Sequence, residues 1–123
     1  MKEVTDTTLH AETSVLNLVI KFYTPNCNPC RILDPVLEEL TRESNLSGIS
    51  WIKVDGAANP ESATAYGVTS VPTLILLEAG KVKAKHVGLS SKDYLLKVLK
   101  EAFPCEGCSS RDTSVFQFAR DES

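Results

Sequence analysis

The sequence TPNCNPCR, residues 24–31, holds two cysteines, Cys27 and Cys30, separated by two residues. It follows a nearly continuous apolar run from Val15 to Tyr23, and it precedes apolar residues at helical spacing: Ile32, Leu33, Val36, Leu37 and Leu40. This pattern predicts a strand, a turn and then a helix that begins at the cysteines. A cysteine pair with this spacing, at a junction between a strand and a helix, is typical of redox chemistry.

The start of a helix lowers the pKa of a thiol placed there, because unpaired backbone N–H groups and the helix dipole favour the thiolate. A cysteine with the usual pKa, near 8.5, is only about 3% ionised at pH 7, whereas one with a pKa of about 7 is half ionised. We therefore expect Cys27 to be the attacking group. Cys30 lies one helical turn further on and faces inward, so we expect it to be the resolving cysteine.

Length and charge exclude several classes of protein. A chain of 123 residues with 42% hydrophobic content indicates one domain with a modest core. Its 13 basic and 16 acidic residues provide no basic surface for nucleic acid or for an anionic membrane. Within the apolar run, the stretch from Val15 to Ile20 is interrupted by Asn17 and followed by Lys21, so it predicts neither a signal peptide nor a membrane span. We expect a cytoplasmic monomer, and in a reducing compartment a cysteine pair is more often catalytic or metal-binding than structural.

Strand and helix patterns alternate through the first half of the chain. The expected elements are an edge strand at 2–5, a short helix at 6–12 capped by Thr5 or Asp6, a strand at 15–23, the cysteine helix at 27–44, a strand at 49–55 and a helix that opens at Asn59-Pro60 and ends before Gly67. Pro35 falls inside the cysteine helix and predicts a kink near Cys30 and Arg31, since proline removes a backbone hydrogen bond.

The second half predicts a hairpin and a final helix. Strands at 73–78 and 81–87 flank a turn at Ala79-Gly80, and the lysines at 81, 83 and 85 are expected to face solvent. The helix should begin at Ser90 or Ser91 and end at Phe103. We expect residues 1–103 to form the domain and residues 104–123 to be a flexible tail. A β-α-β half followed by a β-β-α half predicts an α/β three-layer sandwich with a mixed central sheet.

At these residues the chain resembles the thioredoxin family. The resemblance covers roughly residues 15 to 103 and depends on the first long strand, Cys27-Asn28-Pro29-Cys30, Pro35, the segment Val68-Thr69-Ser70-Val71-Pro72-Thr73, the Gly80 turn and Val87-Gly88. It implies a thioredoxin-like fold and thiol–disulfide exchange, in which Cys27 attacks a substrate disulfide and Cys30 releases the reduced substrate. It also implies disulfide-containing protein substrates, no metal or organic cofactor, and an external electron donor, either a thioredoxin-reductase-like enzyme or a small thiol.

The resemblance further implies that the Val71-Pro72 peptide bond is cis and lies against the cysteine pair. The sequence alone shows only a proline at the start of a strand, and most such bonds are trans. A cis bond there would turn the backbone N–H and C=O of Val71 toward an extended substrate segment. Asn26, Val71 and Pro72 are therefore the expected substrate-binding residues.

Three places depart from the usual family pattern. Lys21 stands where the family commonly has a buried aspartate; it is expected either to lie buried near the sulfurs as a cation or neutral base, or to extend its ammonium group to solvent. Asn28-Pro29 replaces the common Gly-Pro, and residues between the cysteines tune the reduction potential. Tyr23 and Asn26 occupy positions that are often tryptophan, which predicts a smaller and more polar contact rim.

A second pair, Cys105 and Cys108, lies in the tail and outside the resemblance. Three interpretations stay open: a redox relay to Cys27–Cys30, half of a metal site helped by His10 or His86, or thiols with no assigned task. Two other functions for the whole chain also stay open. Thioredoxin-like folds serve as binding or accessory modules with dispensable cysteines, and two CxxC pairs also suit a soft metal ion.

Overall fold

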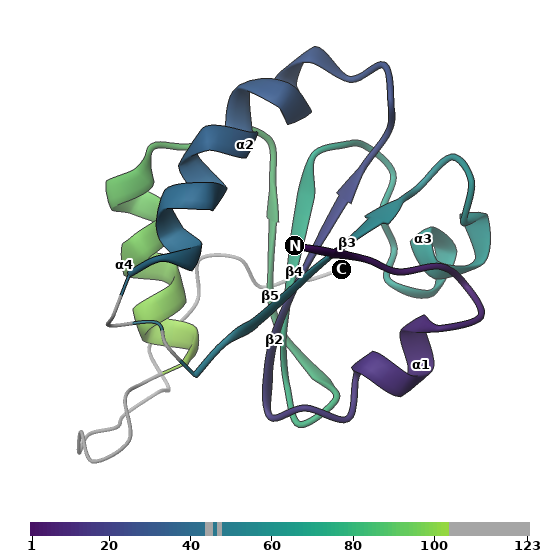
Figure 1. The fold of residues 1–123 in the computed structure, drawn as a ribbon, viewed down its shortest axis with the longest axis horizontal. Helices are drawn as coiled ribbons and strands as arrows, with labels where there is room; N and C mark the ends of the chain where they lie inside the picture. The colour runs from purple at the N-terminus through teal and green to yellow at the C-terminus, as the bar shows by residue number, and fades with distance from the viewer. Residues whose placement is uncertain (44–45, 47, 104–123) are drawn as a thin grey trace.

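The computed structural model describes residues 1–43, 46 and 48–103 (Figure 1). In this part of the chain, one sheet has five strands in the order β1-β3-β2-β4-β5. The strands are β1 (Lys2–Glu3), β2 (Asn17–Tyr23), β3 (Ser50–Asp55), β4 (Thr73–Glu78) and β5 (Lys81–Val87). β1, β3 and β2 run parallel, whereas β4 is antiparallel to both β2 and β5. The predicted mixed sheet is confirmed.

Helices cover both faces of this sheet (Figure 1). α2 (Asn28–Thr41) and α4 (Lys92–Ala102) pack on one face, while α1 (Leu9–Glu12) and α3 (Pro60–Ala65) lie on the other. The three layers confirm the predicted thioredoxin-like α/β/α sandwich. Among the described residues, none of the helices combines the length and the apolar character needed to cross a bilayer.

β2 is the central strand and is buried on both faces. Val19 packs in the core beneath α2 and α4, whereas Ile20 and Phe22 pack in the core beneath α1 and α3. Side chains alternate across a strand, so a strand covered on both faces needs apolar residues at nearly every position. This burial fixes the end of β2, from which the chain enters the cysteine loop.

The cysteine helix α2 continues through Pro35 to Thr41. Leu33, Leu37 and Leu40 are its buried apolar residues, and they recur at the helical spacing that the sequence predicts. Proline lacks the N–H that would bond to the carbonyl one turn earlier, so the helix passes this position with one hydrogen bond fewer. The packing of the leucine stripe on the sheet holds the helix together across it.

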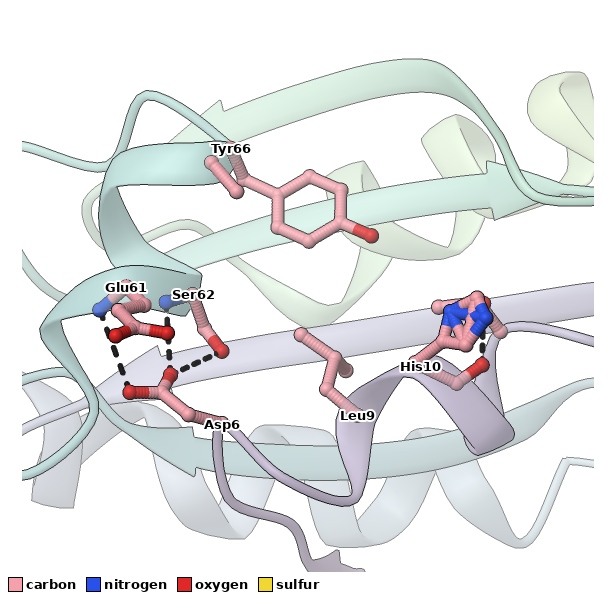
Figure 2. Close-up of a pocket in the computed structure, with 8 residues that line it drawn as sticks. Asp6, Leu9, His10, Glu61, Ser62 and Tyr66 are labelled. Carbon is pink, nitrogen blue, oxygen red and sulfur yellow. Dashed lines mark hydrogen bonds between the residues drawn. The ribbon is translucent and has the colours of Figure 1, made fainter.

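Asp6 caps α3, a helix more than fifty residues further along the chain. Its carboxylate accepts hydrogen bonds from the backbone N–H groups of Ser62 (2.8 Å) and Glu61 (3.4 Å) and from the Ser62 hydroxyl (2.6 Å) (Figure 2). The bond from the Ser62 hydroxyl is the first cause that lowers the pKa of Asp6 below its ordinary value. Asp6 therefore does not open the predicted local helix, which begins only at Leu9.

Asn59 holds the N-cap position of α3 without a capping bond from its own side chain. Instead, its side chain accepts a hydrogen bond from the Asp6 N–H (2.8 Å) and donates one to the Asp55 carbonyl (3.0 Å). The position of the predicted cap was right, but its bonding was not. Asp6 and Asn59 together join the N-terminal segment to α3. Asp6 also lines a hollow together with His10 and Tyr66 (Figure 2).

The lysines of β5 do not form one row in solvent as predicted. Lys83 pairs with Glu78 at 3.2 Å, and Lys85 Nζ donates a hydrogen bond to the Gly67 carbonyl at 2.8 Å. A β-bulge between Leu76 and Leu77 shifts the register of β4 and β5, so side chains beyond it do not keep the simple alternation. Of the three lysines, only Lys81 is exposed.

α4 begins as predicted, with Ser91 as its cap. The Ser91 hydroxyl accepts a hydrogen bond from the Tyr94 N–H at 3.2 Å. The tail predicted at 104–123 lies outside the described residues, and so do Cys105 and Cys108. Both the flexibility of this tail and the domain boundary at residue 103 stay predictions.

Candidate active site

Cys27 occupies the N-cap position of α2, in an extended conformation with φ −95° and ψ 105°. Its Sγ accepts a hydrogen bond from the backbone N–H of Cys30 at 3.0 Å. Serine, threonine, asparagine and aspartate usually occupy this position, because their oxygen satisfies an unpaired N–H of the first turn. Here a sulfur takes that place, so the positive end of the helix faces Cys27.

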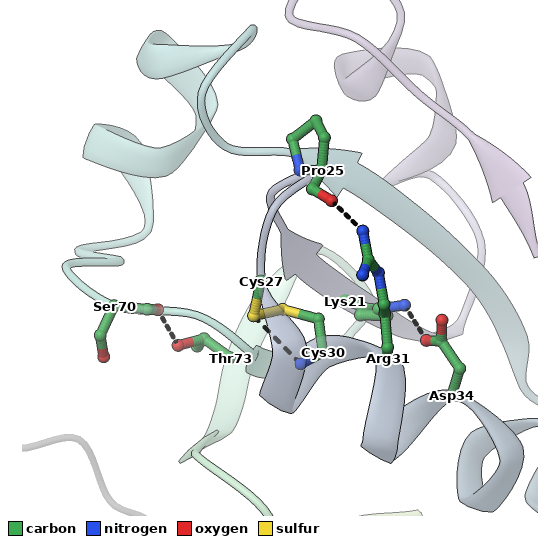
Figure 3. The surroundings of a disulfide bond; sticks show 8 residues. All are labelled: Lys21, Pro25, Cys27, Cys30, Arg31, Asp34, Ser70 and Thr73. Atoms are coloured by element: carbon green, nitrogen blue, oxygen red, sulfur yellow. Dashed lines mark hydrogen bonds and ion pairs between the residues drawn. A yellow bond between two sulfur atoms is a disulfide. The ribbon is translucent and has the colours of Figure 1, made fainter.

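Cys27 and Cys30 form a disulfide, with their Cα atoms 5.2 Å apart (Figure 3). Both residues are buried, with 8% of Cys27 and 3% of Cys30 exposed. Asn28 and Pro29, which lie between them, are the first two residues of α2 and are exposed. Proline is favoured at the start of a helix, since the N–H that it lacks would have no helical partner there.

The loop before the disulfide is held from two sides. The Cys27 N–H donates to the Thr24 carbonyl at 3.3 Å, and the Arg31 guanidinium donates to the Pro25 carbonyl at 2.9 Å (Figure 3). Asn26 lies exposed in this loop, next to Cys27. The loop is therefore closed over the start of α2 by contacts to its backbone carbonyls.

The Val71-Pro72 peptide bond is cis, as the resemblance implies. Pro72 is buried and Val71 is partly exposed. Thr73 follows and pairs with Phe22 of β2, so the cis bond lies beside the strand that leads into the cysteine loop. Figure 3 shows Ser70 and Thr73 in the surroundings of the disulfide, joined by a hydrogen bond of 2.7 Å from the Thr73 hydroxyl to the Ser70 carbonyl.

Exposed apolar side chains lie near the cis peptide bond and on α2. Their exposure was not predicted from the sequence. The Gly88 N–H donates to the Pro72 carbonyl at 2.9 Å, and the residues on either side of Gly88, Val87 and Leu89, are 52% and 47% exposed. Ile32, two residues after Cys30 on α2, is 61% exposed. The signal in the sequence was the pair of large apolar residues around Gly88, just before the cap of the last helix.

Tyr23 does not turn its hydroxyl toward the predicted contact rim. Its hydroxyl lies 2.8 Å from both carboxylate oxygens of Glu3 on β1, to which it donates. Lys53 of β3 lies 3.8 Å from the same carboxylate and 5.8 Å from the Tyr23 ring centroid. Burial, followed by the hydrogen bond to Glu3, raises the pKa of Tyr23 far above its ordinary value, so the phenol stays neutral.

Lys21 is buried beneath α2 and does not extend to solvent. Its side chain is 6% exposed, and its Nζ forms an ion pair with Asp34 of α2 (Figure 3). The same Nζ lies 5.1 Å from the centroid of the Tyr23 ring. This partner of Lys21 was not predicted, although Asp34 stands four residues after Cys30 and so on the same helix face.

The two histidines are not brought together. His10 belongs to α1 on one face of the sheet, whereas His86 contacts Tyr94 of α4 on the other, with ring centroids 5.8 Å apart. Over residues 1–43, 46 and 48–103, no cluster of three or more His, Cys, Asp or Glu side chains is arranged to hold a metal ion. The proposed metal site with Cys105 and Cys108 lies outside these residues.

Comparison with known proteins agrees with this geometry. The family model described as Thioredoxin matches residues 2–101. The thioredoxin of Bacillus subtilis is 37% identical over 99 residues, which span 80% of this chain and 94% of that protein. The bifunctional thioredoxin reductase/thioredoxin of Mycobacterium leprae is 35% identical over 104 residues, which span 83% of this chain and 22% of that protein.

Solved structures agree as well. A mutant thioredoxin from Halobacterium salinarum NRC-1 superposes with a TM-score of 0.76 at 32% sequence identity, over 85% of this chain and 92% of that chain. The match covers most of this chain, in which the Cys27–Cys30 disulfide lies at the start of α2. The chain belongs to the thioredoxin family and is a thiol–disulfide oxidoreductase.

Proposed function

We propose that Cys27 is the nucleophile and Cys30 the resolving cysteine, and that the substrates are protein disulfides. The observation that carries this assignment is the place of the Cys27 sulfur, at the N-cap of α2 and 3.0 Å from the Cys30 N–H. In the reduced protein the same N–H and the same helix end stabilise a thiolate on Cys27. Cys30 lies inside the first turn and not at the N-cap, so its sulfur lacks this stabilisation by the helix end.

The reaction has two exchange steps. The Cys27 thiolate attacks one sulfur of the substrate disulfide, so that a Cys27–substrate bond forms and the other substrate sulfur leaves as a thiolate, which takes a proton. Cys30 then loses its proton and attacks the Cys27 sulfur, and the second substrate thiolate leaves. Two electrons pass to the substrate, and the Cys27–Cys30 disulfide is the oxidised product.

Asn26, Val71 and Pro72 are proposed to contact the substrate. The cis peptide bond and the partial exposure of Val71 support this, because the backbone N–H and C=O of a partly exposed residue can pair with an extended peptide. The exposed side chains of Val87 and Leu89 suit apolar side chains of such a peptide better than they suit a small charged thiol.

The electron donor is proposed to be a thioredoxin-reductase-like enzyme. The Mycobacterium leprae relative, whose name combines thioredoxin reductase and thioredoxin in one chain, supports this choice. A small thiol is the other donor that the sequence leaves open. The cytoplasmic location, the monomeric state and the exclusion of nucleic acid and membrane as partners stay predictions.

The test is trapping of the mixed disulfide. All variants carry Cys105→Ser and Cys108→Ser, so that tail thiols cannot replace the proposed pair. With a protein disulfide as substrate, Cys30→Ser should accumulate an adduct through Cys27, whereas Cys27→Ser should give neither an adduct nor turnover. Turnover by Cys27→Ser in this background, or an adduct on another residue, would overturn the assignment.

A further inference from the structure

A charge pair between a buried lysine and a half-exposed aspartate lies in the surroundings of the disulfide (Figure 3). Asp34 follows Cys30 by four residues on α2, so both side chains are on one face of the helix, and helical side chains lean toward the N-terminus. The carboxylate of Asp34 contacts Lys21 Nζ, which reaches it from the central strand (Figure 3). The ammonium group of Lys21 is therefore held between β2 and the first turns of α2.

The two side chains of this ion pair are exposed to solvent to very different extents. The side chain of Lys21 is 6% exposed, whereas that of Asp34 is 48% exposed. Water screens the carboxylate much more than it screens the ammonium group, because the effective dielectric constant is higher at the surface than inside. The pair consequently presents a net positive field to the protein interior, where Cys30 lies.

Tyr23 adds to the stabilisation of this buried cation. Its ring centroid lies 5.1 Å from Lys21 Nζ, within the range of a cation–π interaction. Leu74, paired with Lys21 on β4, brings no charge, whereas Lys53, paired with Lys21 on β3, is a second cation and lies 3.8 Å from the carboxylate of Glu3. Lys21 is thus held by one carboxylate and one aromatic ring.

The other charged groups near Lys21 on the packed elements have partners of their own. Glu3 of β1 accepts from the Tyr23 hydroxyl and lies 3.8 Å from Lys53 of β3. Asp55 at the end of β3 accepts from the backbone N–H groups of Ala57 and Ala58. Arg31 of α2 donates to the loop carbonyl of Pro25. Asp34 is therefore the carboxylate that neutralises Lys21.

We propose that Lys21, held by Asp34, is a positioning residue that keeps a positive charge behind the sulfurs and stabilises the reduced, ionised form of the Cys27–Cys30 pair. The inference rests on the proposed assignment of Cys27 as the thiolate. Reduction of the disulfide takes two electrons and two protons when both products are thiols, but two electrons and one proton when one product is a thiolate. A buried cation favours the thiolate and leaves the neutral dithiol unchanged, so its effect depends on pH.

The experiment measures the equilibrium constant of the pair with dithiothreitol, with Cys105→Ser and Cys108→Ser in every protein so that one pair is titrated. Lys21→Met keeps the length and the apolar stem but removes the charge. We expect its reduced form to be disfavoured about five- to tenfold at about pH 8.5, because loss of a nearby cation raises the thiol pKa by about one. At about pH 5.5, where both sulfurs are protonated, the constant should equal that of the parent protein.

Matched variants separate charge from packing. Lys21→Arg keeps the charge and should restore the parent constant at both pH values, while Lys21→Gln, which keeps a donor to Asp34, should behave as Lys21→Met does. Tyr23→Phe loses only the bond to Glu3 and keeps the ring near Nζ, so it should leave the constant unchanged. If Lys21→Met or Lys21→Gln leaves the constant unchanged at about pH 8.5, or shifts it equally at both pH values, the inference is wrong.

This outcome is distinguishable from failure of the proposed function. The equilibrium constant is measured without a protein substrate, so it does not depend on which cysteine attacks. Turnover by Cys27→Ser would overturn the assignment of the nucleophile whatever Lys21→Met does. If the equilibrium constant with dithiothreitol at about pH 8.5 is the same in Lys21→Met as in the parent protein, this inference is wrong and the assignment of Cys27 is unaffected.

Discussion

The backbone N–H of Gly88 donates a hydrogen bond to the carbonyl oxygen of Pro72, 2.9 Å away. This bond joins the loop after β5 to the cis peptide bond beside the cysteines. Gly88 has φ +94°, a conformation that side chains of L-residues rarely adopt, so glycine suits this place. Val87 and Leu89, on either side of Gly88, are exposed.

Leu89→Ser should weaken the reaction with protein disulfides. We expect KM for a protein substrate to rise roughly fivefold with kcat little changed, because burying one exposed leucine against a partner contributes about 1 kcal/mol of uniform binding. Turnover of a small disulfide, which is too short to reach Leu89, should be unchanged. Steady-state kinetics with both substrates make the comparison.

Leu16→Ser is the matched control for this prediction. Leu16 is 63% exposed but precedes β2, at the opposite end of that strand from the cysteine loop. An equal rise in KM for Leu16→Ser, or equal losses on both substrates for Leu89→Ser, would show that the leucine beside Pro72 makes no specific contact.

The ion pair between Lys21 and Asp34 predicts an asymmetry in stability. Asp34→Asn leaves the buried ammonium group without its counter-charge and should lower the free energy of unfolding by about 2 kcal/mol, less than for a fully buried pair because Asp34 is half exposed. Lys21→Met should cost less than about 1 kcal/mol, since the remaining carboxylate is hydrated and methionine packs in an apolar site. Denaturant unfolding of the oxidised proteins at neutral pH measures both. A larger loss for Lys21→Met than for Asp34→Asn contradicts the structure.

His86 predicts a loss of stability on the acid side. Burial lowers its pKa below the ordinary 6.5, and its ring Nε2 lies 2.9 Å from the Ser90 hydroxyl. The unfolded chain therefore binds a proton at His86 before the folded protein does, so the stability contributed by the neutral ring is complete above about pH 6.5 and is lost as the pH falls below that value.

His86→Phe should remove this part of the pH dependence. Its melting temperature should fall less between about pH 7 and pH 5 than that of the parent protein, because phenylalanine does not titrate and keeps a ring beside Tyr94. His10→Gln is the control, since His10 is an exposed histidine of α1. Its melting temperature should fall as much as that of the parent protein. If the melting temperatures of the parent protein and of His86→Phe fall equally between about pH 7 and pH 5, His86 does not cause the loss of stability in acid.

Local patterns in the sequence predicted much of the fold. The bounds of β4 and β5 are as predicted, because an apolar run and a Gly80 turn define a hairpin without help from distant residues. The cysteine helix begins as predicted, since a proline near a helix start marks its first turn. These features depend on neighbours within a few residues.

Contacts between distant residues account for the errors. Asp6 was assigned to its own short helix, but its carboxylate binds Ser62, 56 residues away. Lys21 was considered without a partner, although Asp34 neutralises it across two elements. A carboxylate or an ammonium group can bond to a residue close in the sequence or distant from it. The packing of the helices and strands therefore decides which partner Asp6 and Lys21 meet.

The most direct test of the central claim is the titration of the Cys27 thiol in the reduced protein. The rate at which iodoacetamide modifies Cys27, followed by mass spectrometry as the pH is raised, reports the ionisation of that one sulfur. The N-cap position and the Cys30 N–H predict that the pKa of Cys27 lies clearly below the ordinary value of a free thiol. A pKa of about 8.5 or higher, as in an ordinary free thiol, would contradict the account.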